Sequence, residues 1–283
     1  MICFLQSAEQ CQFVKEVGMD KIKYSATVLK NEELQPEIFS LLLEVGEIAE
    51  YAVPGQFIDL YSKEKSRMLP RPISICDVDK AAKTMKIVFR IAGEGTREFS
   101  KLAEGEKVDV VGPLGKGYDL PSAEDENDHI LLGGGIGIPP MLYLAKTMSE
   151  VGIPKSNIKT VLGFRDDNTF LVPEFEKYSE VYITSDNGAA GVKGNVIDGI
   201  KEYGITGNNI YACGPTPMLR GIKSYAMENG IKAQISLEER MACGIGACLA
   251  CVVKTEEVDD HSKVKNKRIC KDGPVFYAEE VNL

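Results

Sequence analysis

Short runs of alternating apolar and polar residues fill the chain after residue 20. Glycines, prolines and charged residues separate these runs at short intervals, which is the pattern of antiparallel strands joined by turns. The runs predict an antiparallel β-barrel over residues 21–120. The expected strands cover residues 23–29, 38–44, 57–61, 71–75, 85–90 and 107–111.

The hydrophobic pattern changes after residues 119–129, a stretch rich in Asp, Glu, Ser and Pro that we interpret as a linker. Beyond it, short apolar runs alternate with apolar residues at helical spacing, as in a parallel sheet covered by helices. We therefore expect an α/β unit over residues 121–235. Its predicted strands cover residues 130–132, 158–164, 180–184 and 208–212.

The two ends of the chain differ from these units. Residues 251–255 and 268–270 predict the two strands of a hairpin, within a small third unit over residues 236–283. Residues 1–20 show no clear period, and we interpret them as an N-terminal extension. The expected fold is multidomain, with a β-barrel, a Rossmann-like parallel sheet and a small C-terminal domain.

Composition indicates a globular chain, and its charge argues against nucleic-acid binding. Hydrophobic residues make up 44% of the chain, and no stretch approaches the roughly 20 apolar residues of a membrane span. A net charge of −9 repels phosphate backbones, and we interpret the basic run at residues 263–268 as the solvated tip of the late hairpin. The start lacks a basic segment followed by an apolar core, so we expect a cytoplasmic protein.

Cysteine spacing carries the most specific chemical signal. Cys243, Cys248 and Cys251 form a C-x4-C-x2-C motif, and Cys270 follows further along. This is the plant-type arrangement of thiolate ligands for a [2Fe-2S] cluster, and small residues between the cysteines let the backbone pass close to sulfur. A structural zinc site is the main alternative, although such sites usually pair two C-x2-C motifs. Four merely buried thiols is the third interpretation.

A glycine-rich turn follows the first strand of the α/β unit. Glycines let the backbone approach a pyrophosphate at a helix N-terminus, although Ile138 departs from the G-x-G-x-x-G pattern. A second strand-to-helix turn follows the strand at residues 208–212, and two such turns would open on one crevice. A tight turn without function is the alternative. The candidate residues are Gly133, Gly134, Gly135 and Gly137 in the first turn, and Cys213, Gly214 and Pro215 in the second.

Five motifs in order resemble the ferredoxin–NADP reductase superfamily with an appended cluster domain. They are Arg71-Pro72-Ile73-Ser74, Gly93-Glu94-Gly95-Thr96, the two turns above and the cysteine set with residues 236–242 before it. Their order and the cysteine spacing are most similar to the electron-transfer subunits of type B dihydroorotate dehydrogenases. The resemblance covers residues 21–283.

The resemblance implies FAD on the barrel, NADH on the α/β unit and a [2Fe-2S] cluster in the C-terminal unit. It places Arg71 on the FAD pyrophosphate, where a planar guanidinium suits two phosphate oxygens, and Ser74 near flavin N5. Arg71 in a surface ion pair and Cys213 as an ordinary buried residue are the alternatives, and no residue is assigned a catalytic role. The other implied contacts are Pro72, an apolar surface at Ile73 where many relatives have an aromatic residue, Val88, Phe89 and Arg90 beside the flavin ring, Gly95 and Thr96 on phosphate, and Cys213 near the nicotinamide.

The family implies a relay in which NADH gives a hydride to FAD, and electrons pass through the cluster to FMN in a dihydroorotate dehydrogenase catalytic subunit. This reaction belongs to pyrimidine biosynthesis, and we expect a heterotetramer of two subunits of each kind. Asp166 and Asp167 follow a sheet strand and favour NADH over NADPH, although Arg165 opposes them. A reductase subunit serving ferredoxin or a hydrogenase is one alternative, and a zinc-stabilised binding module without a redox role is another.

Overall fold

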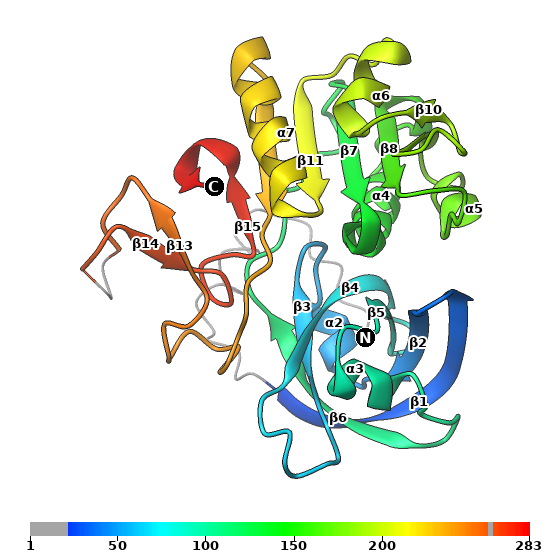
Figure 1. Cartoon of the computed structure of the whole chain (residues 1–283), viewed down its shortest axis with the longest axis vertical. Coiled ribbons are helices and arrows are strands. Elements are labelled where there is room, and N and C mark those ends of the chain that lie inside the picture. Colours follow the sequence, from blue (N-terminus) through cyan, green and yellow to red (C-terminus); the bar gives the residue numbers. More distant parts are fainter. Residues whose placement is uncertain (1–21, 260–262) are drawn as a thin grey trace.

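The computed structural model describes residues 22–259 and 263–283, so the predicted N-terminal extension lies outside the described residues. A β-barrel forms the lower part of the molecule in Figure 1, a sheet with helices forms the upper part, and a small C-terminal unit lies beside both. Within the described chain, no helix is long and apolar enough to cross a membrane.

The predicted barrel is confirmed as a closed, antiparallel sheet in the order β1-β2-β5-β4-β3-β6. Three strands continue beyond their predicted ends, because β1 curves along both β2 and β6, β4 stays paired with β5, and β6 stays paired with β3 as far as Leu114. The strands are β1 (Ile22–Gln35), β2 (Ile38–Glu44), β3 (Phe57–Tyr61), β4 (Arg71–Asp79), β5 (Thr84–Arg90) and β6 (Lys107–Leu114).

Strand alternation separates the two faces of the barrel wall. Ile58 and Leu60 of β3 are fully buried in the barrel interior, whereas Phe57 belongs to the core shared with the other units. Two short helices that the sequence did not predict complete the barrel, and one of them covers the Gly95-Thr96 segment. They are α2 (Ile48–Tyr51) and α3 (Glu94–Phe99).

The second sheet has the order β10-β9-β8-β7-β11-β12-β15, and all its pairs are parallel except that of β12 with β15. This confirms the predicted parallel sheet. Strand β12 was not predicted from sequence. The strands are β7 (His129–Gly134), β8 (Ile158–Phe164), β9 (Glu180–Ser185), β10 (Val192–Lys193), β11 (Asn209–Cys213), β12 (Lys232–Ser236) and β15 (Val275–Tyr277).

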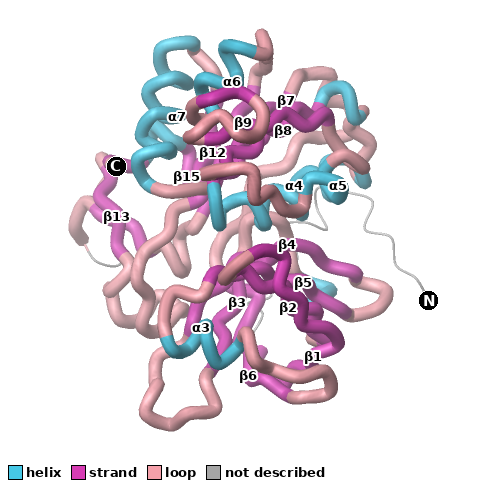
Figure 2. Tube along the Cα trace, turned by 45° about the vertical axis from the view of Figure 1, so that its right-hand side comes forward, coloured by secondary structure: helices cyan, strands magenta, loops and turns pink. Residues whose placement is uncertain are grey.

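Helices cover both faces of this sheet. Alternate residues of β7 point to opposite faces, so Leu131 packs with α4 and α5, while Leu132 packs with α6 and α7. Helix α4 lies between the sheet and the barrel (Figure 2), where Tyr143 donates a hydrogen bond of 2.8 Å to the Ala52 carbonyl. The helices are α4 (Ile138–Glu150), α5 (Val172–Phe175), α6 (Val196–Glu202) and α7 (Thr216–Asn229).

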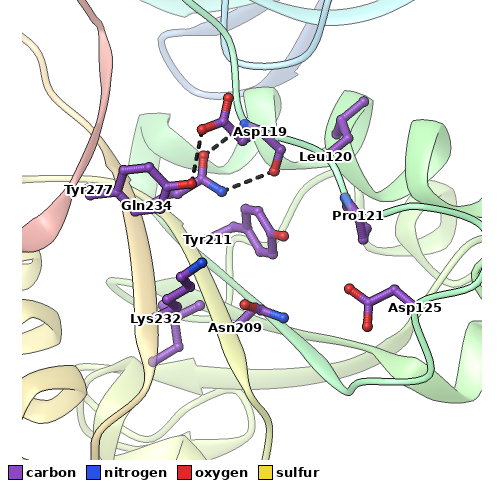
Figure 3. Close-up of a pocket in the computed structure, with 10 residues that line it drawn as sticks. Asp119, Leu120, Pro121, Asp125, Asn209, Tyr211, Lys232, Gln234 and Tyr277 are labelled. Atoms are coloured by element: carbon purple, nitrogen blue, oxygen red, sulfur yellow. Dashed lines mark hydrogen bonds between the residues drawn. The ribbon is translucent and has the colours of Figure 1, made fainter. Parts of the chain in front are cut away.

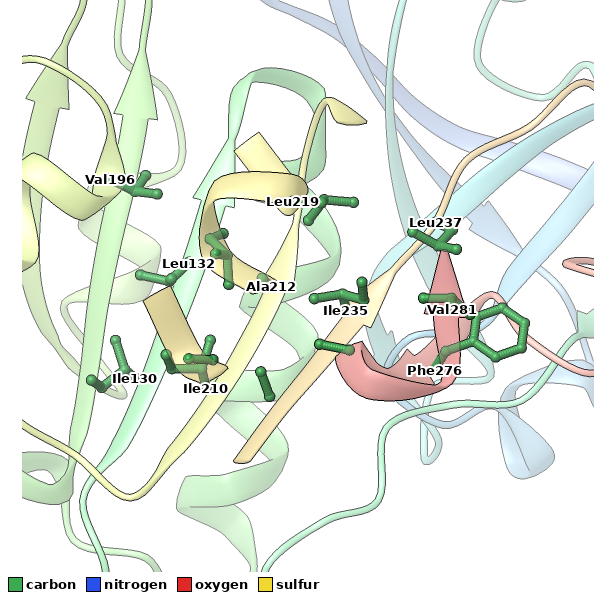
Figure 4. Packing of buried hydrophobic residues seen from close by; sticks show 14 of the residues in the cluster. Ile130, Leu132, Val196, Ile210, Ala212, Leu219, Ile235, Leu237, Phe276 and Val281 are labelled. Atoms are coloured by element: carbon green, nitrogen blue, oxygen red, sulfur yellow. The ribbon is translucent and has the colours of Figure 1, made fainter. Parts of the chain in front are cut away.

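The C-terminal unit contains a hairpin formed by β13 (Val252–Thr255) and β14 (Asn266–Arg268) in antiparallel pairing. The second strand lies two residues earlier than predicted, because the chain turns at Ile269 and Cys270. Strand β16 (Val281–Asn282) joins the other edge of β13. Strand β15, which lies between β14 and β16 in the sequence, pairs with β12 of the large sheet. Figure 4 shows the resulting shared core, in which Phe276 and Val281 continue the row of apolar side chains that begins in the sheet. The boundary at residue 236 stays a prediction.

Candidate functional site

The two glycine-containing turns lie against each other at the carboxyl ends of β7 and β11, which are adjacent parallel strands. A Cβ on Gly137 would overlap the Cys213 carbonyl, so this approach requires glycine. Helix α4 begins directly after one turn and α7 after the other, each with proline in its first positions. Pro139, Pro140 and Pro217 carry no N–H, and the Ile138, Met218 and Leu219 N–H groups already donate to backbone carbonyls. The backbone donors that suit a pyrophosphate at this position therefore belong to the two turns themselves.

Arg71 lies at the start of β4 and packs against the first turn of α3. A Cβ on Gly95 would lie 2.7 Å from Cζ of Arg71, so the guanidinium occupies the space that a side chain would need. The Arg71 guanidinium also donates a hydrogen bond to the Leu69 carbonyl. The Thr96 hydroxyl accepts from the backbone N–H of Ala92 at 2.9 Å and closes the loop before the helix. The fold thus brings together a cation and a helix start, a combination that suits phosphate oxygens.

The remaining barrel candidates divide by exposure. Residues 71–74 are all partly exposed, whereas the next residues of β4 are buried. Phe89 is 1% exposed and stacks with Phe39 inside the barrel, and Val88 is 3% exposed, so only their backbone is placed to contact a flavin. Arg90 is exposed at the end of β5 and reaches to 3.5 Å from the Cβ position of Gly135. Arg90 is therefore a bridge from the barrel to the first glycine-rich turn.

Cys213 ends β11 beside Ser236 of β12 and Gly133 of β7. Burial raises the pKa of its thiol to about 12, although a hydrogen bond with Ser236 partly opposes this shift. The thiol is therefore neutral near pH 7. It lies at the crevice, as predicted, but its protonation state does not favour a nucleophilic role.

The four cysteines of the C-terminal unit come together as two pairs. Cys243 forms a side-chain hydrogen bond with Cys248, and Cys251 forms one with Cys270. Backbone N–H groups also point at sulfur, with Ala247 donating to Cys243 at 3.3 Å. Such N–H donors stabilise thiolates.

The thiol pKa values follow from these contacts. Burial alone would raise the pKa of Cys243, but hydrogen bonds from Ile245 and from Cys248 lower it to about 7. The hydrogen bond with Cys270 lowers the pKa of Cys251 to about 6, and the same bond raises the pKa of Cys270. Thiolates are the form that binds metal, and these contacts favour the thiolate at Cys243 and Cys251.

The paired arrangement distinguishes two kinds of metal site. A zinc ion needs four donors around one point, whereas a [2Fe-2S] cluster binds four cysteines around two irons. Across residues 22–259 and 263–283, no three Cys, His, Asp or Glu side chains converge on a single metal position. Two thiol pairs match the two irons of a binuclear cluster, each of which binds two cysteines.

Two buried side chains that sequence reasoning missed, Arg268 and Asp59, lie against the cysteine loop. Arg268 is 4% exposed, donates to the Gly246 carbonyl at 3.2 Å and forms an ion pair with Asp272 at 3.0 Å. Asp59 of β3 is fully buried and lies against Gly244. The signal in the sequence was Asp59 itself, because it is a single acidic residue within the otherwise apolar strand predicted at residues 57–61.

The cysteine loop also reaches the surface. Cys248 is exposed, and the apolar side chains of Ile245 and Leu249 are 43% and 42% exposed beside it. Cys248 and these two apolar side chains therefore lie in the same exposed loop.

A polar cavity lies at the amino ends of two strands of the large sheet, at the end opposite the glycine-rich turns. Asn209 begins β11 there, and Lys232 begins β12. Figure 3 shows Gln234 and Tyr277 gathered around Asp119 in this cavity. The Gln234 amide accepts from the Asp119 N–H at 2.8 Å and donates to its carbonyl at 3.0 Å, while the Tyr277 hydroxyl donates to its carboxylate at 3.0 Å. These bonds fix the linker to β12 and β15, away from the glycine-rich turns.

Comparisons with known proteins agree with this geometry. Residues 238–282 match a family model described as the iron-sulfur cluster binding domain of dihydroorotate dehydrogenase B. The chain is 42% identical over 257 residues to the dihydroorotate dehydrogenase B (NAD(+)) electron transfer subunit of Streptococcus pneumoniae, covering 90% of this chain and 97% of that protein. It is 40% identical over 263 residues to the subunit of the same name from Fusobacterium nucleatum, covering 91% and 97%.

A solved structure supports the fold over nearly the whole chain. The structure of an NADH-dependent reduced ferredoxin-NADP oxidoreductase, described in connection with flavin-based electron bifurcation, superposes with a TM-score of 0.80. It is 31% identical in sequence, and the match covers 92% of this chain and 90% of that chain.

Proposed function

The chain belongs to the family of electron transfer subunits of dihydroorotate dehydrogenase B, and from this premise we propose the path of electrons through it. It is an oxidoreductase component that takes electrons from NADH and passes them to the FMN of a catalytic subunit, where dihydroorotate and orotate interconvert in pyrimidine biosynthesis. FAD, when bound, takes up electrons in pairs and releases them singly to the [2Fe-2S] cluster.

One observation supports this order of electron transfer from NADH to FAD to the cluster. The barrel contacts the nucleotide crevice on one side and the cysteine loop on another. Arg90 of β5 reaches the first glycine-rich turn, and Asp59 of β3 packs against Gly244 of the cysteine loop. A flavin bound to the barrel would therefore lie between the nicotinamide and the cluster. This geometry supports transfer through the barrel.

On the barrel, Arg71 and the start of α3 at Gly95 hold the pyrophosphate of FAD. Thr96 keeps the loop before this helix closed through its hydrogen bond to Ala92. Residues 72–74 lie along the accessible part of β4, where Ile73 offers an apolar surface and Ser74 a hydroxyl to the flavin ring. Arg90 adds a positive charge at the edge that faces the nucleotide.

On the α/β unit, the turns at residues 133–137 and 213–217 hold the pyrophosphate of NADH through backbone N–H groups. Asp166 follows β8 and accepts hydrogen bonds from the backbone and side chain of Asn168, which lower the pKa of its carboxyl group. Asp166 therefore remains ionised near pH 7. This charge and that of Asp167 favour a ribose hydroxyl over a 2′-phosphate.

The cluster is the exit to the partner, and the exposed loop around Cys248 forms the contact with the catalytic subunit. Ile245 and Leu249 supply the apolar part of this surface. A cluster near the surface shortens the distance to an acceptor in another chain. We propose an assembly of two electron-transfer and two catalytic subunits.

Reconstitution tests the proposal. The purified chain should show flavin and iron-sulfur absorption bands, release FAD on extraction and reduce dyes with NADH, yet fail to reduce orotate alone. Addition of a type B catalytic subunit should create NADH-to-orotate activity. Conversion of orotate by the isolated chain would contradict the relay.

A second candidate is supported by the 31% identity with the ferredoxin-NADP oxidoreductase structure. In that case the exposed loop would serve ferredoxin instead of a catalytic subunit. Parallel assays with ferredoxin and with the catalytic subunit separate the two, because only the physiological partner should saturate at low concentration. The zinc alternative is disfavoured by the two thiol pairs.

A further inference from the structure

Asp59 stands out among the charged residues because it is fully buried on the outer face of the barrel wall. It lies in β3 between two side chains that point into the barrel, Ile58 and Leu60. Since alternate residues of a strand point to opposite faces, Asp59 points away from the barrel interior. Its backbone partners are Pro72 of β4 and Val111 of β6.

The Asp59 carboxylate fills the space beside Gly244, the residue that follows the first cysteine of the loop. A Cβ on Gly244 would overlap Oδ2 of Asp59. Gly244 also has φ of 63°, a conformation that residues with a Cβ rarely adopt. The loop therefore passes the barrel with its backbone pressed against this carboxylate.

Asp59 and Cys243 both act on Tyr61, which places the Asp59 carboxylate near Cys243. Burial raises the pKa of Tyr61, and the Asp59 carboxylate is the next largest cause, with Lys23 opposing and Cys243 adding to the shift. Lys23 forms an ion pair of 3.0 Å with Asp109, and both side chains are largely exposed. On another side of the loop, the charge of Arg268 faces the Asp272 carboxylate.

We propose that the buried charge of Asp59 lowers the reduction potential of the [2Fe-2S] cluster while its side chain seats the cysteine loop on the barrel. This inference rests on the proposed cluster. Reduction adds a negative charge to the cluster, and a second negative charge nearby opposes it. Because Asp59 is shielded from water, its field is screened much less than that of a surface carboxylate.

Asp59 is therefore a positioning residue that belongs to the flavin barrel but acts on the cluster. The contact between Asp59 and Gly244 also holds the cysteine loop against the barrel.

A redox titration followed by electron paramagnetic resonance of the reduced cluster tests this inference. Asp59→Asn removes the charge and keeps the shape, so reduction of the cluster should become at least tenfold more favourable, which is about 59 mV for one electron. Asp109→Asn is the matched control, because Asp109 lies opposite Tyr61 on β6 but is exposed. Its potential should equal that of the wild type.

Asp59→Glu guards against a loss of the cluster in the first variant. If Asp59→Asn holds less iron than Asp59→Glu, the titration still gives the potential of the clusters that remain in Asp59→Asn, and a potential raised by the stated amount supports the inference. An unchanged potential in Asp59→Asn, an equal shift in Asp109→Asn, or loss of iron in both Asp59 variants would overturn it. Absence of any [2Fe-2S] signal in the wild type would instead contradict the proposed function.

Discussion

The nucleotide crevice and the cysteine loop solve the problem of holding a charged group in opposite ways. In the proposed crevice, the backbone of the two turns that precede α4 and α7 forms the site, and side chains are excluded where Gly137 meets Cys213. In the loop, four thiol side chains are the proposed ligands, and buried side chains from β3 and β14 contact the backbone. A backbone site should be sensitive to added bulk, whereas a side-chain site should be sensitive to lost atoms.

Loss of one thiol should have the largest effect. Cys270→Ser should remove most of the iron, because one iron loses a thiolate, while FAD stays on the barrel. Iron, sulfide and flavin analysis of the purified protein measures this. Cys76→Ser is the control, since Cys76 is a buried thiol that packs in a different core from the loop. Full iron content in the Cys270 variant would refute the ligand assignment.

Added bulk in the crevice should have the next largest effect. Gly137→Ala places a methyl group on the Cys213 carbonyl, so the two turns must separate. We expect the kcat/KM for NADH in dye reduction to fall roughly a hundredfold, about 2.7 kcal/mol, with iron unchanged. Gly221→Ala in α7 is the control, because its Cβ would meet only the tip of Ile197 at 3.2 Å. Equal losses in both variants would mean that bulk in the crevice has no special effect.

A smaller effect should come from the charges that select the nucleotide. The wild type should prefer NADH, and replacing Asp166 and Asp167 together by Ser should improve the use of NADPH roughly tenfold, about 1.4 kcal/mol. The ratio of kcat/KM for the two nucleotides in dye reduction decides this. Equal efficiency of the wild type with both would remove the basis of the prediction. The iron content should stay unchanged, because the nucleotide and the cluster are expected at separate sites.

The smallest effect concerns pH and His129, at the amino end of the strand that leads to the crevice. His129 is fully buried, and burial lowers its pKa from 6.5, although Asp125 and Asp128 oppose the shift. The neutral ring is therefore favoured in the folded state. Its contribution to stability is complete above about pH 6.5 and is lost as the pH falls through the lower folded value.

Urea unfolding of the protein without bound cofactors, repeated between pH 7.5 and 5.5, gives the free energy of unfolding and so measures this contribution. His129→Phe keeps an aromatic ring but cannot take up a proton, so it should reduce the loss of stability on acidification by about 1 kcal/mol. Within the part of the chain that the structure describes, neither nitrogen of His129 has a hydrogen-bond partner, and Nε2 lies 4.0 Å from an Asp125 carboxylate oxygen, so a phenyl ring loses only this contact. An identical pH dependence in both proteins would exclude His129 as a cause.

Local pattern predicted most of the elements of both regions. The strands at residues 38–44, 57–61 and 158–164 have the predicted ends, because alternation and flanking turns are local features. The short helix α3 was missed, since Glu94–Phe99 is too brief for a helical period to appear. Strand β15 was missed as well, because its partner β12 belongs to a different unit.

The sequence by itself determined the chemistry of the two regions: thiolate spacing specified a cluster, and glycine turns after strands specified an anion crevice. Only the tertiary structure decided how they are connected. The contact of Asp59 with Gly244, that of Gly137 with Cys213 and that of Arg90 with Gly135 each join residues far apart in the chain. The physical reason is that spacing along the chain governs local ligation, whereas burial and the packing of strand faces decide which distant charges come to lie beside it.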